Sequence, residues 1–307
     1  MTLPVETDPG GTAPADPTPR VVVPELRAVF ADRSMRFRQL ARGRNDADYL
    51  VFLSTLAAAQ HAVAGEGGST LDHASGGDPP LDVTSLLRHV DWHVDLDRLL
   101  TRLRPDATGN LLAVVEAMDV ASRTELDVLA VAMLEGAPAP VAAQLAWMPI
   151  VAAALQVTWT RAASKLDPAR LRCATTATQC PACGYAPVAS VVQTGGERTG
   201  RRYLQCALCA CEWYLVRVSC STCGATDGVS YLKLEAEGEG EQGYPTVRAE
   251  ICDACRSYLK VIDRSRDGFA EAHADDLASL ALDVLVGEHG YQRSGPNLLF
   301  APGTTDD

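Results

Sequence analysis

The feature that most constrains this chain is a set of eight cysteines between residues 180 and 255. Two thiolates separated by two residues can face inward from one tight turn, and two such turns supply the four sulfurs of a tetrahedral metal site. The spacing therefore predicts two metal ions per chain, each bound by four cysteines. The eight form four Cys-x-x-Cys pairs: Cys180/Cys183, Cys206/Cys209, Cys220/Cys223 and Cys252/Cys255.

The four pairs can combine in two ways. Joining the first pair to the second and the third to the fourth lets each half of the region close on itself, whereas crossed pairing requires closure over a longer range, so we expect the adjacent arrangement. A four-sulfur shell suits zinc and also a rubredoxin-type iron, and ligand spacing does not distinguish them. Cys173 and Cys211 lie outside the pattern. We expect Cys211 to be a small buried apolar residue and leave the role of Cys173 open.

Short strands with period-two patterning separate the cysteine pairs and repeat after about forty residues. We therefore predict a first four-cysteine ribbon module over residues 173–218 and a second over residues 219–267. Each unit is too small to hold a large apolar core, and structural zinc commonly supplies the missing stability, on the order of 10 kcal/mol or more. The strands are expected at 187–193, 201–205, 212–218, 229–235, 246–251 and 258–263.

The remainder of the chain has helical periodicity. Residues 1–22, rich in Pro, Gly, Thr and Asp, are predicted to be a disordered tail, followed by an all-helical domain over 23–172. Within it we expect a single helix over 83–103, a capping box at Ser122 and Glu125, and a buried helix over 140–166 that is kinked at Pro149. Residues 268–307 should form a C-terminal helix, 271–286, and a tail. The fold class is thus α+β, with tandem rubredoxin-like or zinc-ribbon modules.

Composition limits the environment and the ligands of the protein. The apolar fraction of 47% allows a large core, and the formal net charge of −12 argues against broad nucleic-acid binding. The first twenty residues lack the basic and apolar regions of a secretory signal, and the most apolar run is interrupted by Gln144, Pro149 and Gln156. We therefore expect a cytoplasmic protein with no membrane insertion, in a reducing compartment where paired cysteines hold metal.

Four further patterns carry less weight. A G-x-G-x-x-G match over 238–243 links two strands, is acidic and precedes no helix, so we do not assign nucleotide binding to it. His89 and His93 are interpreted as the charged face of a helix. The adjacent carboxylates of Asp275 and Asp276 diverge by about 100° on a helix and do not form an acid/base pair. The last pattern is a basic cluster that is either a solvated edge or a contact for an acidic protein partner: Arg198, Arg201 and Arg202.

Several of these segments together resemble one family, the formate dehydrogenase accessory protein FdhE. The similarity lies in the sequence CPACG at 180–184 with PVASVV at 187–192, in RYLQCALC at 202–209 with Glu212-Trp213, and in ADDLASL at 274–280. It is specific from about residue 180 to 300 and weaker over the helical half. The resemblance implies a non-catalytic cytoplasmic protein whose rubredoxin-type sites can hold iron.

The resemblance also implies a role, namely an assembly chaperone that binds the catalytic subunit of a respiratory formate dehydrogenase during its maturation. Two alternatives stay open. A thiolate-bound iron would allow a rubredoxin-like electron carrier, and the ribbon fold with its arginines would allow a zinc-ribbon nucleic-acid binder, which the acidic composition disfavours. No enzymatic activity is predicted, because closed four-thiolate shells leave no coordination position for substrate. The native metal, the contact surface on the partner and the oligomeric state do not follow from the sequence.

Overall fold

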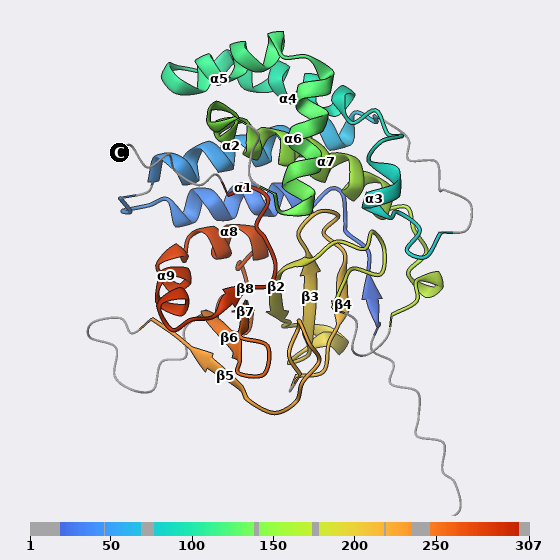
Figure 1. Cartoon of the computed structure of the whole chain (residues 1–307), viewed down its shortest axis with the longest axis vertical. Coiled ribbons are helices and arrows are strands. Elements are labelled where there is room, and N and C mark those ends of the chain that lie inside the picture. Colours follow the sequence, from blue (N-terminus) through green and yellow to red (C-terminus); the bar gives the residue numbers. More distant parts are fainter. Residues whose placement is uncertain are drawn as a thin grey trace, which may run out of the picture.

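Helices and a single sheet form two layers in this computed structural model, which describes residues 19–45, 47–68, 77–137, 141–173, 178–217, 219–234 and 246–300. Figure 1 shows the N-terminal helices in one layer above the sheet, with α8 and α9 packed beside the strands. The helices are α1 (Val29–Leu40), α2 (Ala47–Gly65), α3 (Val83–Leu86), α4 (His93–Leu103), α5 (Gly109–Val120), α6 (Arg123–Glu135), α7 (Met148–Ala163), α8 (Ala272–Leu277) and α9 (Leu280–Glu288).

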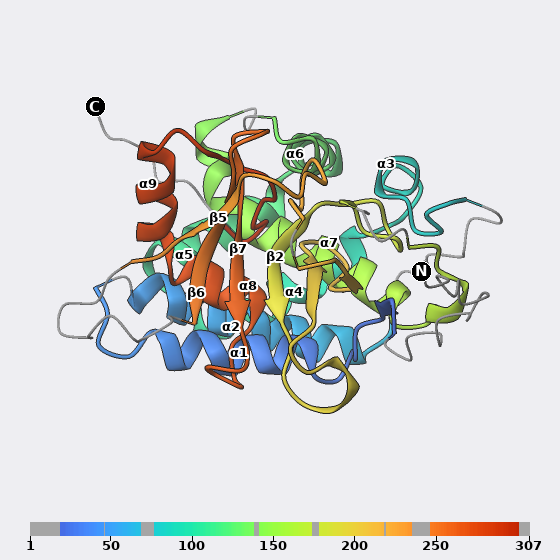
Figure 2. The same cartoon turned by 90° about the horizontal axis from the view of Figure 1, so that it is seen from below.

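The described strands all belong to one sheet, in the order β1-β4-β3-β2-β7-β6-β5 with β8 paired to β7. Strand β2 of the first predicted module runs parallel to β7 of the second, so the two modules share a continuous sheet rather than standing as separate units (Figure 2). The strands are β1 (Val21–Val22), β2 (Pro187–Val192), β3 (Arg202–Cys206), β4 (Glu212–Tyr214), β5 (Val229–Leu232), β6 (Val247–Cys252), β7 (Ser257–Asp263) and β8 (Gln292–Arg293).

The helical layer is centred on α7, in which every residue from Pro149 to Ala163 is buried. The predicted kink at Pro149 is wrong, because this proline lies in the first turn of α7 and a separate 3-10 segment, Ala142–Trp147, precedes it. A missing N–H is harmless in a first turn, where it has no intrahelical acceptor. The same apolar core includes the two Cys-x-x-Cys pairs of the first module. Within the described residues, no helix has both the length and the apolar character needed to span a bilayer.

Two of the predicted helices are each divided into two in the structure. The helix expected over 83–103 is two helices, α3 and α4, and the C-terminal helix expected over 271–286 is broken between α8 and α9. At that break the Lys260 ammonium donates to the carbonyls of Asp276 and Ser279, at 2.7 and 3.1 Å, so the interrupted backbone acceptors are satisfied. The capping box of Ser122 and Glu125 at the start of α6 is confirmed.

The N-terminal boundary also differs from the prediction. Residues 1–18 lie outside the described residues, but Val21 and Val22 form β1 and pair with Trp213 and Glu212 of β4. The segment assigned to a tail up to residue 22 therefore includes an edge strand of the sheet. Through it, the beginning of the described chain is attached to the first four-cysteine module.

Candidate metal centres

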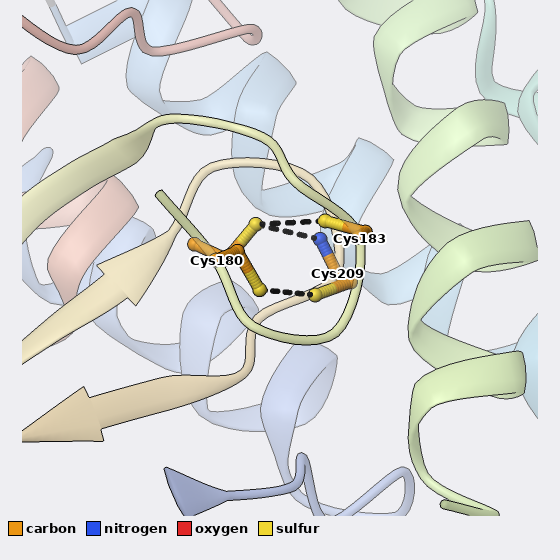
Figure 3. Close-up of side chains that lie close together, drawn as sticks. Cys180, Cys183 and Cys209 are labelled. Atoms are coloured by element: carbon orange, nitrogen blue, oxygen red, sulfur yellow. Dashed lines mark hydrogen bonds between the residues drawn. The ribbon is translucent and has the colours of Figure 1, made fainter. Parts of the chain in front are cut away.

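The first centre collects its four sulfurs from two turns that face each other. Cys180 and Cys183 lie in the loop before β2, and Cys206 and Cys209 lie at the end of β3 and in the turn that follows. The sulfurs of Cys180 and Cys209 are 3.5 Å apart, and those of Cys183 and Cys206 are 3.4 Å apart. Figure 3 shows the side chains of Cys180, Cys183 and Cys209 pointing toward one another. The predicted adjacent pairing is confirmed for this half.

The second centre repeats the design. The sulfurs of Cys220 and Cys255 are 3.7 Å apart and those of Cys223 and Cys252 are 3.8 Å apart. In both centres all four sulfurs lie within 4.8 Å of one another. A tetrahedral site with metal–sulfur bonds of about 2.3 Å has sulfur–sulfur edges of about 3.8 Å, so both groups are of a size that could hold a metal ion. The geometry does not favour zinc over iron.

The turns repeat their backbone chemistry as well. In each module the first Cys-x-x-Cys turn ends in a glycine with positive φ, Gly184 or Gly224, whose N–H donates to the carbonyl of the first cysteine. Each second turn is followed by a non-glycine residue with positive φ, Ala210 or Arg256. This left-handed conformation turns the chain back into the next strand and costs a side-chain-bearing residue of order 1 kcal/mol or more.

Burial separates the two centres. All four cysteines of the first are buried, with exposed fractions of 2% or less, and belong to the main apolar core. In the second, Cys223 is exposed and Cys255 is half-buried. The Cys255 sulfur also lies 2.9 Å from the hydroxyl of Ser257. One site is therefore part of the protein interior, whereas the other meets solvent.

Each centre has one thiol whose pKa is lowered. Burial raises the pKa of Cys180, but hydrogen bonds from Cys183, Cys206 and Cys209 outweigh it and bring the pKa well below the usual value. In the second centre burial likewise opposes ionisation, and backbone N–H groups of Cys223 and Thr222 help lower the pKa of Cys220 to about 7. Ionisation of Cys180 and of Cys220 is thus favoured before a metal binds, and metal binding to thiolates releases protons to the solvent.

A buried polar network supports the second turn of the first centre. Gln156 of α7 donates to the carbonyl oxygen of Ala207 at 2.8 Å, and Nε2 of His273 lies 3.2 Å from the same oxygen. Arg33 of α1 joins these residues, with Nη1 3.0 Å from Gln156 Oε1 and Nη2 2.9 Å from His273 Nδ1, and it pairs with Glu271 at 3.1 Å. The helical layer and α8 thereby hold the turn between Cys206 and Cys209.

This supporting set was not among the predicted site residues. In the sequence Gln156 interrupts an apolar run, and a buried amide inside such a run requires a hydrogen-bond partner, which is the signal that points to its role. Glu271, His273, Asp275 and Asp276 are all buried around α8. As predicted, the two adjacent carboxylates do not converge: Asp275 pairs with Arg36 at 2.6 Å, and Asp276 lies 3.3 Å from Lys260 Nζ and 2.7 Å from Arg293.

The structure separates the three arginines of the predicted basic cluster. Arg202 is buried and pairs with Glu250 at 2.6 Å, so it is not available to a partner surface. Its guanidinium instead joins the two modules. Arg198 is about one-third exposed and pairs with Glu212 at 2.9 Å, and Arg201 is half-buried. Only Arg198 and Arg201 therefore remain as candidate contacts.

The structure tests the predictions for His89, His93, Cys173 and Cys211. His93 is buried and hydrogen-bonded to Asp127 at 2.9 Å, so it does not belong to a solvated charged face, whereas His89 is exposed. Cys211 is fully buried, as expected, and Cys173 is half-buried. The G-x-G-x-x-G match over 238–243 lies outside the described residues. Among the described residues, the groups able to ligate a metal are the two cysteine clusters.

The fold and the site define a class of protein: a helical domain joined to tandem four-cysteine ribbons in a shared sheet. Most of the chain matches three family models in succession, "FdhE, N-terminal" over residues 18–175, "FdhE, central domain" over 179–217 and "FdhE, C-terminal domain" over 218–300. This chain belongs to the FdhE family.

Individual relatives agree with this assignment. The chain is 37% identical to "Protein FdhE" of Salmonella dublin over 297 residues, covering 94% of this chain and 93% of that protein. It is 39% identical to "Protein FdhE homolog" of Pseudomonas aeruginosa over 285 residues, covering 90% and 91%. The crystal structure of the FdhE protein from Pseudomonas aeruginosa superimposes with a TM-score of 0.82 at 36% identity, covering 93% of this chain and all of that one.

Proposed function

We propose that this protein is a non-catalytic accessory protein for the maturation of a respiratory formate dehydrogenase, and that it binds the catalytic subunit of that enzyme in the cytoplasm. The observation that carries the proposal is the match to all three FdhE family models together with two cysteine groups of tetrahedral size. The two groups would each hold one iron or zinc ion. Their four-sulfur shells would be closed, which suits recognition and structure rather than hydrolysis or group transfer.

The proposed binding surface includes the ribbon modules and the two accessible arginines, Arg198 and Arg201. Exposed charges of this kind chiefly affect encounter and specificity. Charge reversal at Arg201 should therefore slow association with the partner more than it changes stability. The buried Arg202 serves as a poor site for such a test, because its replacement would disturb the joint between the modules.

Co-purification tests the proposal directly. The host is a strain that produces formate dehydrogenase and whose own copy of the gene has been deleted. An affinity-tagged copy of the full chain expressed in this strain should retain the catalytic subunit. Formate dehydrogenase activity should be lost on deletion and restored by the tagged copy. An Arg201→Glu variant should retain less of the subunit, with Arg88→Glu, an exposed arginine on the helical layer, as the matched control. Failure to retain the subunit, combined with full activity in the gene-deleted strain, would overturn the proposal.

A second candidate function is electron exchange with a partner, and the exposure of the second centre favours it. Cys223 is exposed, so a thiolate-bound iron there would lie close to the surface, where short transfer distances to another protein are possible. Purification without oxygen followed by metal analysis and visible absorption separates the two functions. Zinc alone in both sites removes the redox candidate and leaves the accessory role intact.

A further inference from the structure

A cavity of about 660 Å³ lies where three parts of the protein meet. Its walls come from α1 and the segment before it, from the first module, and from residues 268–271 ahead of α8. It also lies directly beside the first metal centre, because Gln205 and Ala210 line it and flank the turn that carries Cys206 and Cys209. A ligand in this cavity would contact the helical and ribbon parts at once.

The guanidinium groups of the cavity wall already have carboxylate partners, although Arg198 and Arg264 share one. Arg36 pairs with Asp267 and Asp275, at 2.7 and 2.6 Å. Arg198 and Arg264 both pair with Glu212, at 2.9 and 3.4 Å. Each of these guanidiniums thus has a carboxylate within 3.4 Å. Glu271, another wall residue, forms an ion pair with Arg33.

Three acceptors on the same wall have no partner within the described part of the chain. Glu25 and Asp32 are exposed acids on the first turns of the α1 region, and neither forms an ion pair there. Gln205 is 4% exposed, and its Oε1 has no hydrogen-bond donor. A buried amide oxygen without a donor costs about 1–3 kcal/mol. Burial raises the pKa of Asp32 most, the carboxylates of Glu271 and Glu25 raise it further, and the guanidinium of Arg264 lowers it.

Apolar groups border these acceptors. Phe269 is 76% exposed and Met35 is 58% exposed, and both line the cavity together with Val22, Val23 and Val29. Large apolar side chains left in solvent around a polar centre are typical of interaction sites. The combination of an apolar border with unpaired acceptors fits a side chain that has an aliphatic stem and a cationic end.

Residues 1–18 and 301–307 do not supply such a side chain. Residues 1–18 contain Glu6, Asp8 and Asp16 and no Lys or Arg, and residues 301–307 contain Asp306 and Asp307. Like charges would oppose the binding of these acidic side chains at Glu25 and Asp32. We propose that the cavity binds an extended segment of a partner protein that inserts an arginine or lysine side chain between Glu25, Asp32 and Gln205, with flanking apolar residues on Phe269 and Met35. This inference is independent of the identity of the partner.

Fluorescein-labelled pentapeptide pools provide the probe, because the partner sequence is not specified. The central residue is fixed as Arg, Lys, Gln or Glu, and the other four positions are drawn from Ala, Val, Leu and Phe. Fluorescence anisotropy with the zinc-loaded full chain should show the Arg and Lys pools binding at least about tenfold more tightly than the Gln pool, which corresponds to about 1.4 kcal/mol. The Glu pool should bind least.

The double variant Glu25→Gln/Asp32→Asn should lose this preference. Both positions are exposed, so the fold and the zinc content should be unchanged. The matched control is Asp97→Asn/Glu288→Gln, which makes the same charge change at exposed positions outside the cavity and should retain the preference. Three outcomes would each overturn the proposal. The Arg and Gln pools could bind with equal affinity, the double variant could keep the preference for the Arg and Lys pools, or no pool could bind at millimolar peptide. None of these outcomes depends on formate dehydrogenase.

Discussion

Arg202 of the first ribbon module and Glu250 of the second form a 2.6 Å ion pair that is enclosed by the protein, with side-chain exposed fractions of 2% and 3%. Arg202 also donates to the hydroxyl of Ser190 at 2.6 Å and to the carbonyl of Ser219 at 3.0 Å. One guanidinium thus joins β2, β3, β6 and the segment between the modules. The tandem repeat is held together by this contact and by the parallel pairing of β2 with β7.

Replacement of Arg202 by methionine should strongly destabilise the protein. It would leave Glu250 buried without its cation, and breaking a buried pair from one side costs about 3–5 kcal/mol. The free energy of unfolding, measured by urea denaturation of the metal-loaded protein, reports the change. Arg198→Met is the control, because its pair with Glu212 is about one-third exposed and should contribute less than about 1 kcal/mol. A double Arg202→Met/Glu250→Met variant should recover most of the loss, and similar costs for the two single arginine variants would contradict the interpretation.

Replacement of Gln156 by leucine should weaken the first metal centre selectively. The amide holds the Ala207 carbonyl and accepts from Arg33, so its removal loosens the turn between Cys206 and Cys209. Loss of outer hydrogen bonds typically lowers metal affinity about 10–100-fold. Zinc competition titrations should therefore show about a tenfold or greater loss at one site and none at the other. Gln292→Leu, at an exposed position in β8, should leave both affinities unchanged, and equal weakening of both sites in Gln156→Leu would refute the supporting role.

The metal centres and the helical architecture could be predicted from the sequence because their signals are local. A Cys-x-x-Cys turn, the Ser122–Glu125 cap and an apolar helical stripe each depend on residues a few positions apart. The adjacent pairing of the turns followed from the repeat itself. These features are all present in the structure.

The parts that could not be predicted depend on contacts between distant residues. Lys260 satisfies the carbonyls at the break between α8 and α9 from sixteen or more residues away, so an uninterrupted apolar stripe does not reveal the break. The sequence places Arg202 in a basic cluster with Arg198 and Arg201 and does not reveal its burial, because its partner, Glu250, belongs to the other module. Gln156 and His273 both bind the Ala207 carbonyl and are bridged by Arg33, and no sequence pattern connects these residues.

The stability of the protein should depend on pH through His273. Burial and the neighbouring Arg33 lower the pKa of His273 below its usual value of 6.5. As the pH falls below about 6.5, the unfolded chain therefore protonates His273 before the folded protein does, and this favours unfolding. The contribution of His273 to stability is thus complete above about pH 6.5 and is lost as the pH falls from that value toward the folded pKa. Urea denaturation between pH 8 and pH 5.5 should show this loss, and His273→Gln should flatten it. His289→Gln, at an exposed position, is the control, and an identical pH slope in wild type and His273→Gln would contradict the assignment.

The two centres should release metal at different rates, because solvent and chelator reach them differently. The first lies in the apolar core, so a chelator must wait for the core to open, whereas Cys223 of the second is exposed. With zinc in both sites, mixing with a chromogenic chelator should give two phases of equal amplitude whose rates differ at least about tenfold, equivalent to about 1.4 kcal/mol in the barrier. Cys223→Ser should abolish the fast phase and leave the slow one, whereas Cys183→Ser should also lower the stability of the helical layer. A single phase for both ions, or loss of the slow phase in Cys223→Ser, would show that burial does not control metal exchange.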